Sequence, residues 1–232
     1  MVLTGDRGEN LRVPSIRSVN VGLPRQAAWA GIGRTSIDKR PVTGPVMVRR
    51  LGLEGDQVSD TRHHGGADQA VYVFAREDLD RWATELGLDI PDGQFGENLT
   101  TDGIDVNEAE VGERWLVGDA VLEVASIRIP CNDFKSWMGR CGYDARTWVK
   151  RFAAENRPGP YLRVLTEGEV RAGDEITVAH RPGHGVTVST MFRALTTESS
   201  LLPELLNVEG LVAEARAKAE AYAPPLTVVD AG

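Results

Sequence analysis

The segment of residues 120–129 constrains the fold more than any other, because apolar side chains occupy both faces of its extended form. Val121 and Ile127 point to one face, whereas Leu122 and Val124 point to the other. A strand that is apolar on both faces needs protein above and below it. The sequence therefore predicts a core strand that is buried on both sides for part of its length.

Further short apolar runs are separated by glycine and proline, which is typical of a multi-stranded β domain. The expected strands are residues 46–53, 70–74, 114–117, 120–129, 161–165 and 175–179. Gly118-Asp119 predicts a tight hairpin, and Gly173-Asp174 predicts another between Val170 and Ile176. Repeated hairpins of this kind favour a barrel.

Helical periodicity occurs in fewer places. Residues 76–86 have an apolar side and end at Gly87, and residues 144–155 form a second candidate. After a proline- and glycine-rich link, we expect three short helices around residues 190–195, 203–206 and 208–222, the last with Asn207 as its N-cap. We therefore expect a main domain over residues 1–184 and a small helical domain over residues 185–232.

Charge and cysteine content exclude several classes of protein. The chain has 26 Lys and Arg against 34 Asp and Glu, a net charge of −8, which argues against nucleic acid as its main partner. No apolar stretch approaches the ~18 residues of a membrane span, and the first residues are too charged for a signal peptide. We expect a cytoplasmic protein in which Cys131 and Cys141 are free thiols.

Familiar catalytic motifs are missing from the sequence. It contains no phosphate-binding loop of the G-x-x-x-x-G-K-(S/T) type, no G-x-S-x-G elbow and no H-E-x-x-H pair, so nucleotide hydrolases, serine hydrolases and zinc peptidases lose support. His180 and His184 have finger-like spacing, but Pro182 and Gly183 between them prevent a shared helix. We interpret these histidines as linker residues.

Two loops could bind an anion. In the loop of residues 60–66, Gly65 and Gly66 allow backbone N–H groups to converge, and His63 or His64 can add a donor. A ligand phosphate would fit there; the alternative is a tight loop that merely leads into the next strand. The loop of residues 95–100 contains Asn98, which can donate and accept hydrogen bonds, but on its own it is an ordinary turn.

Cys131 follows Pro130 at the end of the predicted core strand, close to Arg128. Arg128 or a metal would hold its sulfur as the thiolate, the form that binds metals or attacks substrates. Free cysteine is also among the most buried residue types, so packing is the alternative role. Cys141 has no comparable setting, and we interpret it as structural.

Several short motifs, taken in order, resemble the MOSC family, the molybdenum-cofactor sulfurase C-terminal domain, and in particular its bacterial stand-alone YiiM type. The similarity covers residues 15–223 and includes the three-helix tail. The motifs are Gly52-Leu53-Glu54-Gly55-Asp56-Gln57, Asp60, His64-Gly65-Gly66-Ala67-Asp68-Gln69-Ala70-Val71-Tyr72, Phe95-Gly96-Glu97-Asn98-Leu99-Thr100, Arg128-Ile129-Pro130-Cys131 and Tyr161-Leu162-Arg163-Val164.

The resemblance implies a mainly β fold with some helix: a closed β-barrel-like core and a small C-terminal three-helix appendage. It also implies that Cys131 binds the molybdenum of a pterin dithiolene cofactor, next to Arg128. The expected pterin-phosphate pocket consists of His63, His64, Gly65, Gly66, Phe95, Gly96 and Asn98. Lys39 and Arg163 are expected at the anionic end of the cofactor or at the substrate.

By the same resemblance, we expect a molybdenum-dependent oxidoreductase that reduces N-hydroxylated small molecules, including N-hydroxylated nucleobases, to the N–H form. No flavin, haem or iron–sulfur motif is visible, so a separate redox protein is expected to deliver the electrons. One alternative is a molybdenum cofactor carrier without turnover, and another is an interaction module. An apolar stripe on the last predicted helix permits a homodimer without requiring one.

Overall fold

The computed structural model describes residues 13–62 and 64–222. The strands are β1 (Ser15–Val21), β2 (Arg25–Gln26), β3 (Arg34–Thr35), β4 (Arg40–Pro41), β5 (Val46–Arg49), β6 (Gly52–Leu53), β7 (Val71–Ala75), β8 (Leu99–Asp102), β9 (Arg114–Val117), β10 (Ala120–Ile127), β11 (Pro160–Thr166), β12 (Gly168–Val170) and β13 (Ile176–His180). The helices are η1 (Ala67–Gln69), α1 (Arg76–Leu86), α2 (Asn132–Arg140), α3 (Trp148–Glu155), α4 (Val188–Thr196), η2 (Ser199–Asn207) and α5 (Ala213–Glu220).

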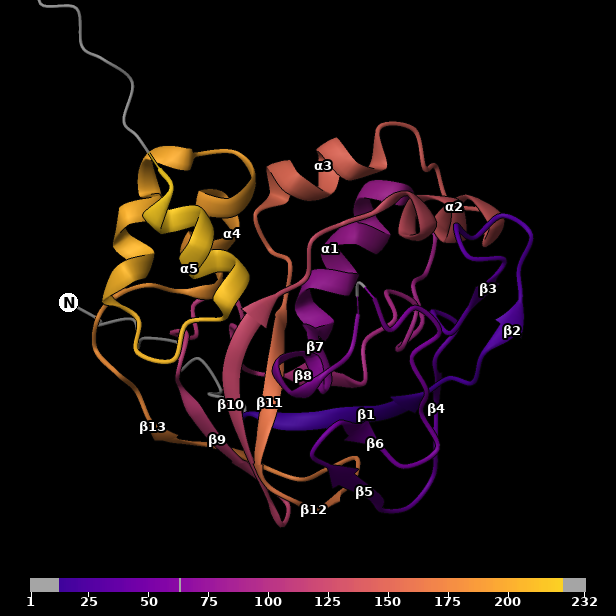
Figure 1. Cartoon of the computed structure of the whole chain (residues 1–232). Coiled ribbons are helices and arrows are strands. Elements are labelled where there is room, and N and C mark those ends of the chain that lie inside the picture. Colours follow the sequence, from indigo (N-terminus) through magenta and orange to yellow (C-terminus); the bar gives the residue numbers. More distant parts are fainter. Residues whose placement is uncertain (1–12, 63, 223–232) are drawn as a thin grey trace, which may run out of the picture.

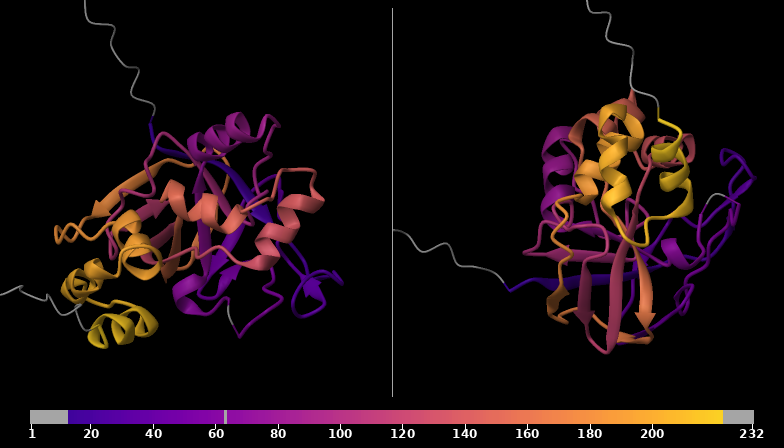
Figure 2. Two further views of the ribbon diagram at one scale, coloured as in Figure 1. Left: turned by 90° about the horizontal axis from the view of Figure 1, so that it is seen from above. Right: turned by 60° about the vertical axis from the view of Figure 1, so that its left-hand side comes forward.

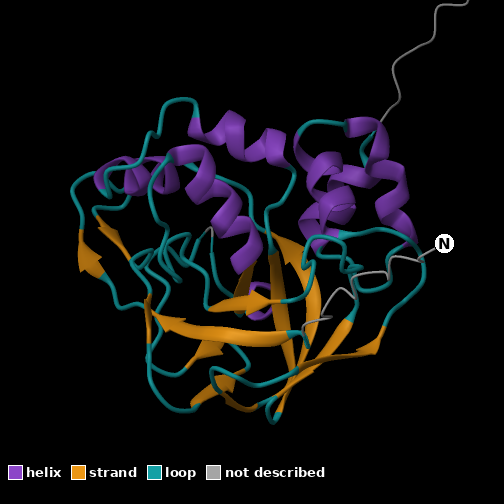
Figure 3. Cartoon of the chain, turned by 180° about the vertical axis from the view of Figure 1, so that it is seen from behind, coloured by secondary structure: helices purple, strands orange, loops and turns teal. Residues whose placement is uncertain are grey.

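The fold is mixed α/β and is built on one large sheet. Its eight strands have the order β13-β9-β10-β11-β7-β8-β1-β4, and all neighbours are antiparallel except β7 and β8. A smaller sheet, β12-β5-β6, lies beside it. Helices α1, α2 and α3 lie on one side of the strands, and α4 and α5 form a separate group near β10 (Figures 1 and 3).

The expectation of a closed β-barrel-like core is wrong. Strands β13 and β4 stand at opposite ends of the large sheet, and no ladder joins them in the part of the chain that the structure describes. The hairpin expected at Gly173-Asp174 is also wrong, because β12 pairs with β5 and β13 pairs with β9. A turn motif limits where the chain reverses, but it does not choose the partners of the two strands it connects.

The hairpin at Gly118-Asp119 is confirmed, with Val117 opposite Ala120. Gly118 has a φ of 53°, and a Cβ atom there would clash with the backbone oxygen of Glu169. No other residue type fits this position without movement of the backbone. The turn therefore brings the large sheet close to the strand β12 of the small sheet.

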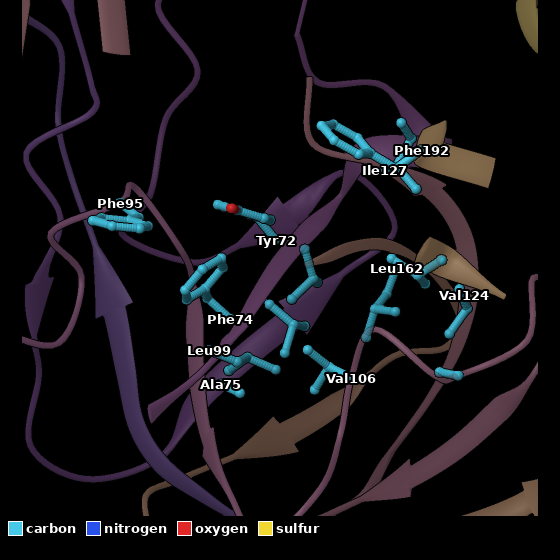
Figure 4. Close-up of a cluster of buried hydrophobic side chains, with 14 of the residues drawn as sticks. Tyr72, Phe74, Ala75, Phe95, Leu99, Val106, Val124, Ile127, Leu162 and Phe192 are labelled. Atoms are coloured by element: carbon cyan, nitrogen blue, oxygen red, sulfur yellow. The ribbon is translucent and has the colours of Figure 1, made fainter. Parts of the chain in front are cut away.

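Strand β10 is buried on both faces, as its sequence predicts. Val124 on β10, Leu162 on β11 and Phe74 on β7 belong to one buried cluster (Figure 4). Under the helices, Phe95 packs edge-on against Phe134 with ring centroids 5.1 Å apart. This aromatic contact ties the loop before β8 to helix α2, and so holds two segments that are far apart in sequence.

Helix α1 spans the predicted residues and ends at Gly87, which has a left-handed conformation. Helix α3 begins only at Trp148, later than predicted, because Thr147 has a φ of 52°. Helix α2 was not predicted from the sequence. Asn207 is the last residue of η2 and not the N-cap of the final helix, since Gly210 with a φ of 69° interrupts the chain before α5.

The C-terminal helices lie side by side at one edge of the molecule (Figure 2). Helix α4 contacts β10, and η2 contacts both α4 and α5. That residues 185–232 form a separate domain stays a prediction. Within residues 13–62 and 64–222, no helix is long and apolar enough to cross a membrane.

Candidate functional site

A cavity opens where strand β10 ends and helix α2 begins. Its empty space is about 930 Å³, part of it open to solvent, which is in the size range of small-molecule pockets. The structure brings together at this cavity most of the residues that the sequence singled out: Lys39, His64, Gly65, Phe95, Gly96, Asn98, Arg128 and Cys131.

Two of the predicted site residues that the structure describes are not among those that line the cavity. Gly66 immediately precedes η1. Arg163 forms ion pairs with Asp68 at 2.9 Å and Glu123 at 3.0 Å, and it donates to the backbone oxygen of Gly210 at 3.3 Å. It therefore links the large sheet to the C-terminal segment. His63 lies outside the described residues.

Cys131 directly precedes helix α2, whose first-turn N–H groups make this end of the helix positive. Its side chain is half-buried and lines the cavity. Asp133, in the first turn of α2, accepts hydrogen bonds from the backbone N–H of Gly31 at 3.1 and 3.2 Å. This contact holds the segment between β2 and β3 against the start of the helix, so that it forms one wall of the site.

Arg128 is a buried cation, 6% exposed, for which the described residues provide no carboxylate partner. Its Nη2 lies 4.0 Å from the sulfur of Cys131, and its Nη1 donates to the backbone oxygen of Ile129 at 3.3 Å. Burial lowers the pKa of Arg128, but its interactions with Tyr161, Cys131 and Tyr72 outweigh burial and raise it above the ordinary value. A fixed positive charge therefore faces the sulfur.

Lys39 does not present a free charge to the cavity. Its ammonium forms a buried ion pair with Asp56; the side chains of Lys39 and Asp56 are 9% and 7% exposed. Burial lowers the pKa of Lys39, while the Asp56 carboxylate acts in the opposite direction. Asp56 also accepts from the backbone N–H of Gly22 at 2.8 Å, so it organises this wall of the site.

The side-chain amide of Asn98 forms its hydrogen bonds with other residues of the protein. Its Oδ1 accepts from the N–H of Tyr72 at 3.1 Å, and its Nδ2 donates to Asp56 at 2.9 Å and to the backbone oxygen of Asn20 at 3.3 Å. The sequence placed Asp56 in a motif but did not mark it as a site residue. Only the three-dimensional contact of Asp56 with residues 39 and 98 shows that Asp56 belongs to the site.

The carboxylate of Glu97 holds the backbone of the loop of residues 95–98 through hydrogen bonds. This side chain is fully buried and accepts from the N–H of Phe95 at 2.9 Å and from the hydroxyl of Thr100 at 3.0 Å. Burial raises its pKa to about 7. The N–H of Gly96 donates to Gly93 at 3.0 Å, so Gly96 contributes space to the cavity and not a donor.

These residues fit an anionic group that carries a metal able to bind a thiolate. Arg128 supplies positive charge for which the described residues provide no carboxylate partner, and Cys131 supplies a sulfur ligand beside it. A thiolate is the ligand type preferred by metals that are already coordinated by sulfur. A cofactor made of a pterin dithiolene and molybdenum has both properties, whereas a neutral ligand would leave the charge of Arg128 uncompensated.

Comparison with known proteins identifies the family of the chain. Residues 60–177 match the MOSC domain. The uncharacterized protein YflK of Bacillus subtilis (strain 168) is 32% identical over 175 residues, which are 75% of this chain and 77% of YflK. Protein YiiM of Escherichia coli (strain K12) is 36% identical over 100 residues, 42% of this chain and 45% of YiiM.

A protein of Gibberella moniliformis (strain M3125 / FGSC 7600) named "Reductase" is 29% identical over 194 residues, but this chain spans only 33% of its length. Among solved structures, YiiM from Geobacillus stearothermophilus has the same fold, with a TM-score of 0.73 at 23% identity over 89% of this chain and 97% of that one. MOSC domains are associated with molybdenum cofactor binding. The family match and the YflK alignment together show that the chain belongs to the MOSC domain family.

Proposed function

We propose that this protein is a molybdenum-cofactor-dependent oxidoreductase that reduces N-hydroxylated compounds, N-hydroxylated nucleobases included, to the N–H form. One observation carries the proposal: the sulfur of Cys131 faces the same cavity as the guanidinium of Arg128, for which the described residues provide no carboxylate partner. Membership of the MOSC family supports the cofactor, and the fungal relative named "Reductase" supports the reaction class.

In this proposal, Cys131 would bind the metal through its thiolate. Arg128 would compensate the negative charge of the sulfur and of the bound group. The other walls would be provided by His64 and Gly65 on one side and by Phe95 on another, since all three line the cavity. Lys39 would act through Asp56, as part of the wall, and not as a direct ligand for an anion.

When bound, the molybdenum cofactor supplies a metal centre that accepts an oxygen atom in a two-electron reaction. In the overall balance, R–NH–OH, two electrons and two protons give R–NH₂ and water. Burial raises the pKa of Tyr161, so its phenol keeps its proton near neutral pH and can donate a hydrogen bond. Arg128 stays charged and holds the sulfur side of the site electropositive.

The electrons would come from a separate redox protein. With a net charge of −8, this chain would associate fastest with a donor whose contact surface is basic. Association should then slow as ionic strength rises, because the attraction between exposed charges is screened by salt.

The two cysteines provide a matched test. Cys131→Ser replaces the soft ligand by a hydroxyl, and we expect molybdenum per chain and turnover of an N-hydroxylated base to fall at least about tenfold. Cys141→Ser changes the half-buried thiol beyond the end of α2 and should leave both quantities unchanged. Full metal occupancy and turnover in Cys131→Ser would refute the proposed ligation.

The same measurements separate an enzyme from a cofactor carrier. The protein is purified from a molybdenum-replete host, and turnover per bound molybdenum is measured with a chemical reductant in place of the redox partner. Turnover that follows the metal content supports a reductase. Normal metal content in the unmodified chain without turnover of any N-hydroxylated compound would refute the reductase and favour the carrier.

A further inference from the structure

The turn between β5 and β6 places an apolar and a basic side chain in solvent beside the cavity. The ladder of the two strands ends at Arg49 and Gly52. Arg50 and Leu51 are therefore the two residues of the turn, whereas two-residue hairpin turns favour Gly, Asn or Asp. Leu51 is 66% exposed, the highest value among the large apolar side chains that the structure describes. Neither turn chemistry nor core packing accounts for these two residues.

Leu51 lies where the cavity opens to solvent. Two further apolar side chains line the cavity there: Val58, which is 37% exposed, and Ile32, which is half-buried. Arg34 is exposed and lines the cavity as well. We call these four residues together with Arg50 the rim. Exposed apolar side chains that gather in one place, with polar residues around them, mark a contact site.

The exposed charge of the rim is positive. Arg34 donates to the backbone oxygen of Ser59 at 3.3 Å, and neither Arg34 nor Arg50 forms an ion pair within the described residues. Next to the rim, Arg62 is 75% exposed and lies 3.7 Å from Asp60, whose side chain is only 24% exposed. The cations therefore extend into solvent further than the carboxylate does.

The other carboxylates of this region are already bound by the protein. Asp56 and Asp133 accept hydrogen bonds from backbone N–H groups at 2.8 and 3.1 Å. Behind the turn, Glu54 and Glu167 both bind the guanidinium of Arg49, at 2.8 and 3.2 Å. These carboxylates leave the two rim arginines available to a partner.

The charge around the opening differs in sign from that of the whole chain. The charged residues that line the cavity or flank the rim are six Lys and Arg (residues 34, 39, 49, 50, 62 and 128) and five Asp and Glu (residues 54, 56, 60, 133 and 167). The whole chain has 26 against 34. Exposed charges interact over only about 8 Å at physiological ionic strength. The net charge of −8 thus favours a basic partner only at low salt, whereas a protein that docks at the opening meets exposed arginines.

We propose that the rim is the docking surface of the electron donor, and that this donor is a small acidic electron-carrier protein. The inference rests on the proposed reductase function. Leu51 packs at the centre of the contact, and the rim arginines pair with carboxylates of the carrier. Complexes of this kind have small interfaces, and complementary charge sets their rate of association. Two reduced one-electron carriers give one electron each, so that R–NH–OH, two electrons and two protons yield R–NH₂ and water.

The test measures association with the full chain, purified from a molybdenum-replete host, by surface plasmon resonance. The probes are a plant-type [2Fe–2S] ferredoxin, which is a small acidic carrier, and cytochrome c, a basic carrier of similar size. Arg50→Glu reverses one charge of the rim. Lys150→Glu makes the same change of charge at an exposed position of α3 that lies outside the cavity.

We expect the ferredoxin to associate faster than cytochrome c at physiological ionic strength. Arg50→Glu should lower the association rate constant of the ferredoxin at least about fivefold, because a charge at the edge of an interface acts mainly on association. The loss should disappear toward 1 M salt, where the Debye length is about 3 Å. Lys150→Glu should leave the rate constant within about twofold of the unmodified chain, since its charge lies far from the contact.

Leu51→Ser gives a second test that changes no charge. It should raise the dissociation rate constant of the ferredoxin about tenfold, because the loss of an apolar contact acts mainly on dissociation. Leu88→Ser is its control: this leucine is 49% exposed and does not line the cavity, so its removal should change neither rate constant. Equal behaviour of the two leucine variants would overturn the inference.

Four other results would also overturn it. Faster association of cytochrome c would show that the net charge selects the partner. No association of the ferredoxin, or equal effects of Arg50→Glu and Lys150→Glu, would show that the rim is not its contact. Tighter binding of a single-stranded oligonucleotide, lost in Arg50→Glu, would assign the rim to nucleic acid. Dimerisation of the chain that is lost in the same variant would assign the rim to a second copy.

A small chemical reductant separates this inference from the proposed function, because it needs no docking surface. Arg50→Glu should keep the turnover driven by the chemical reductant and lose the turnover driven by reduced ferredoxin. If ferredoxin association depends on Arg50 but no reductant supports reduction of an N-hydroxylated compound, the reductase proposal fails alone. If chemically driven turnover is normal and association does not depend on Arg50, the docking inference fails alone.

Discussion

Removal of Asp56 tests whether Lys39 serves the wall of the cavity or a cofactor phosphate. Asp56→Ala leaves the Lys39 ammonium, whose side chain is 9% exposed, without its buried partner. It also removes the acceptor for the N–H of Gly22 and for Nδ2 of Asn98. Breaking a buried ion pair on one side costs about 3–5 kcal/mol, because an uncompensated charge remains.

Urea unfolding of a single and a double variant measures this cost. We expect Asp56→Ala to lose about 3–5 kcal/mol of unfolding free energy, and the pair Lys39→Met with Asp56→Leu to recover most of it, since no buried charge is then left. The molybdenum content of the double variant should stay within about twofold of the unmodified chain, which is small against the tenfold losses expected of a lost ligand.

The loss in Asp56→Ala should also depend on pH. Burial already lowers the pKa of Lys39 below 10.5, and without Asp56 the main contributions that raise this pKa are gone, leaving a smaller one from Glu97. A lysine whose pKa is lower in the folded than in the unfolded state destabilises the fold when protonated, so Asp56→Ala should regain stability as pH rises toward 10.5. Tighter cofactor retention in Asp56→Ala at neutral pH would refute this reasoning and return Lys39 to the anion site.

Three further predictions concern the residues around the cavity and between the sheets. Burial raises the pKa of Glu97 to about 7, so the protonated carboxyl stabilises the fold and this contribution is lost as the carboxyl ionises. In urea unfolding, the free energy of unfolding of the unmodified chain relative to Glu97→Gln should fall by about 3 kcal/mol as pH rises from 4.5 to 7. A difference between the two chains that does not change with pH would contradict the raised pKa. Gly118→Ala should lower the unfolding free energy by about 1–3 kcal/mol more than Gly173→Ala. Both glycines have a positive φ, but only at Gly118 would the added methyl group meet a backbone oxygen, that of Glu169. Equal losses in the two variants would contradict the close approach of Glu169. Arg163→Met should lower the melting temperature and leave molybdenum per chain unchanged, since Arg163 links the sheet to Gly210; loss of metal at unchanged stability would place it at the cofactor.

Local patterns were sufficient for many individual elements. The two-sided apolar run predicted buried β10, and the helical spacing before Gly87 predicted α1 with its bounds. The same patterns missed β1, β8 and α2. Residues 99–102 form a short strand of mixed polarity, and α2 contains Gly139 and begins two residues after Pro130, so neither has a clear period of its own.

The sequence by itself determined that a cysteine follows the core strand near an arginine. It also determined that the chain contains two glycine-containing loops, residues 60–66 and 95–100. It also carried the order of motifs that resembles the MOSC family, and the family match agrees with that resemblance. These are properties of neighbouring residues, which local spacing and residue type express directly.

Only the tertiary structure decided the strand order, the pairing of Lys39 with Asp56, and the position of Arg163 away from the cavity. It also decided that the C-terminal helices enclose a recess beside Arg128. An ion pair forms between opposite charges that lie within a few ångströms of each other. The charged residues that pair here are separated by many residues along the chain. The distances between them are set by the packing of the whole core, which no local pattern contains.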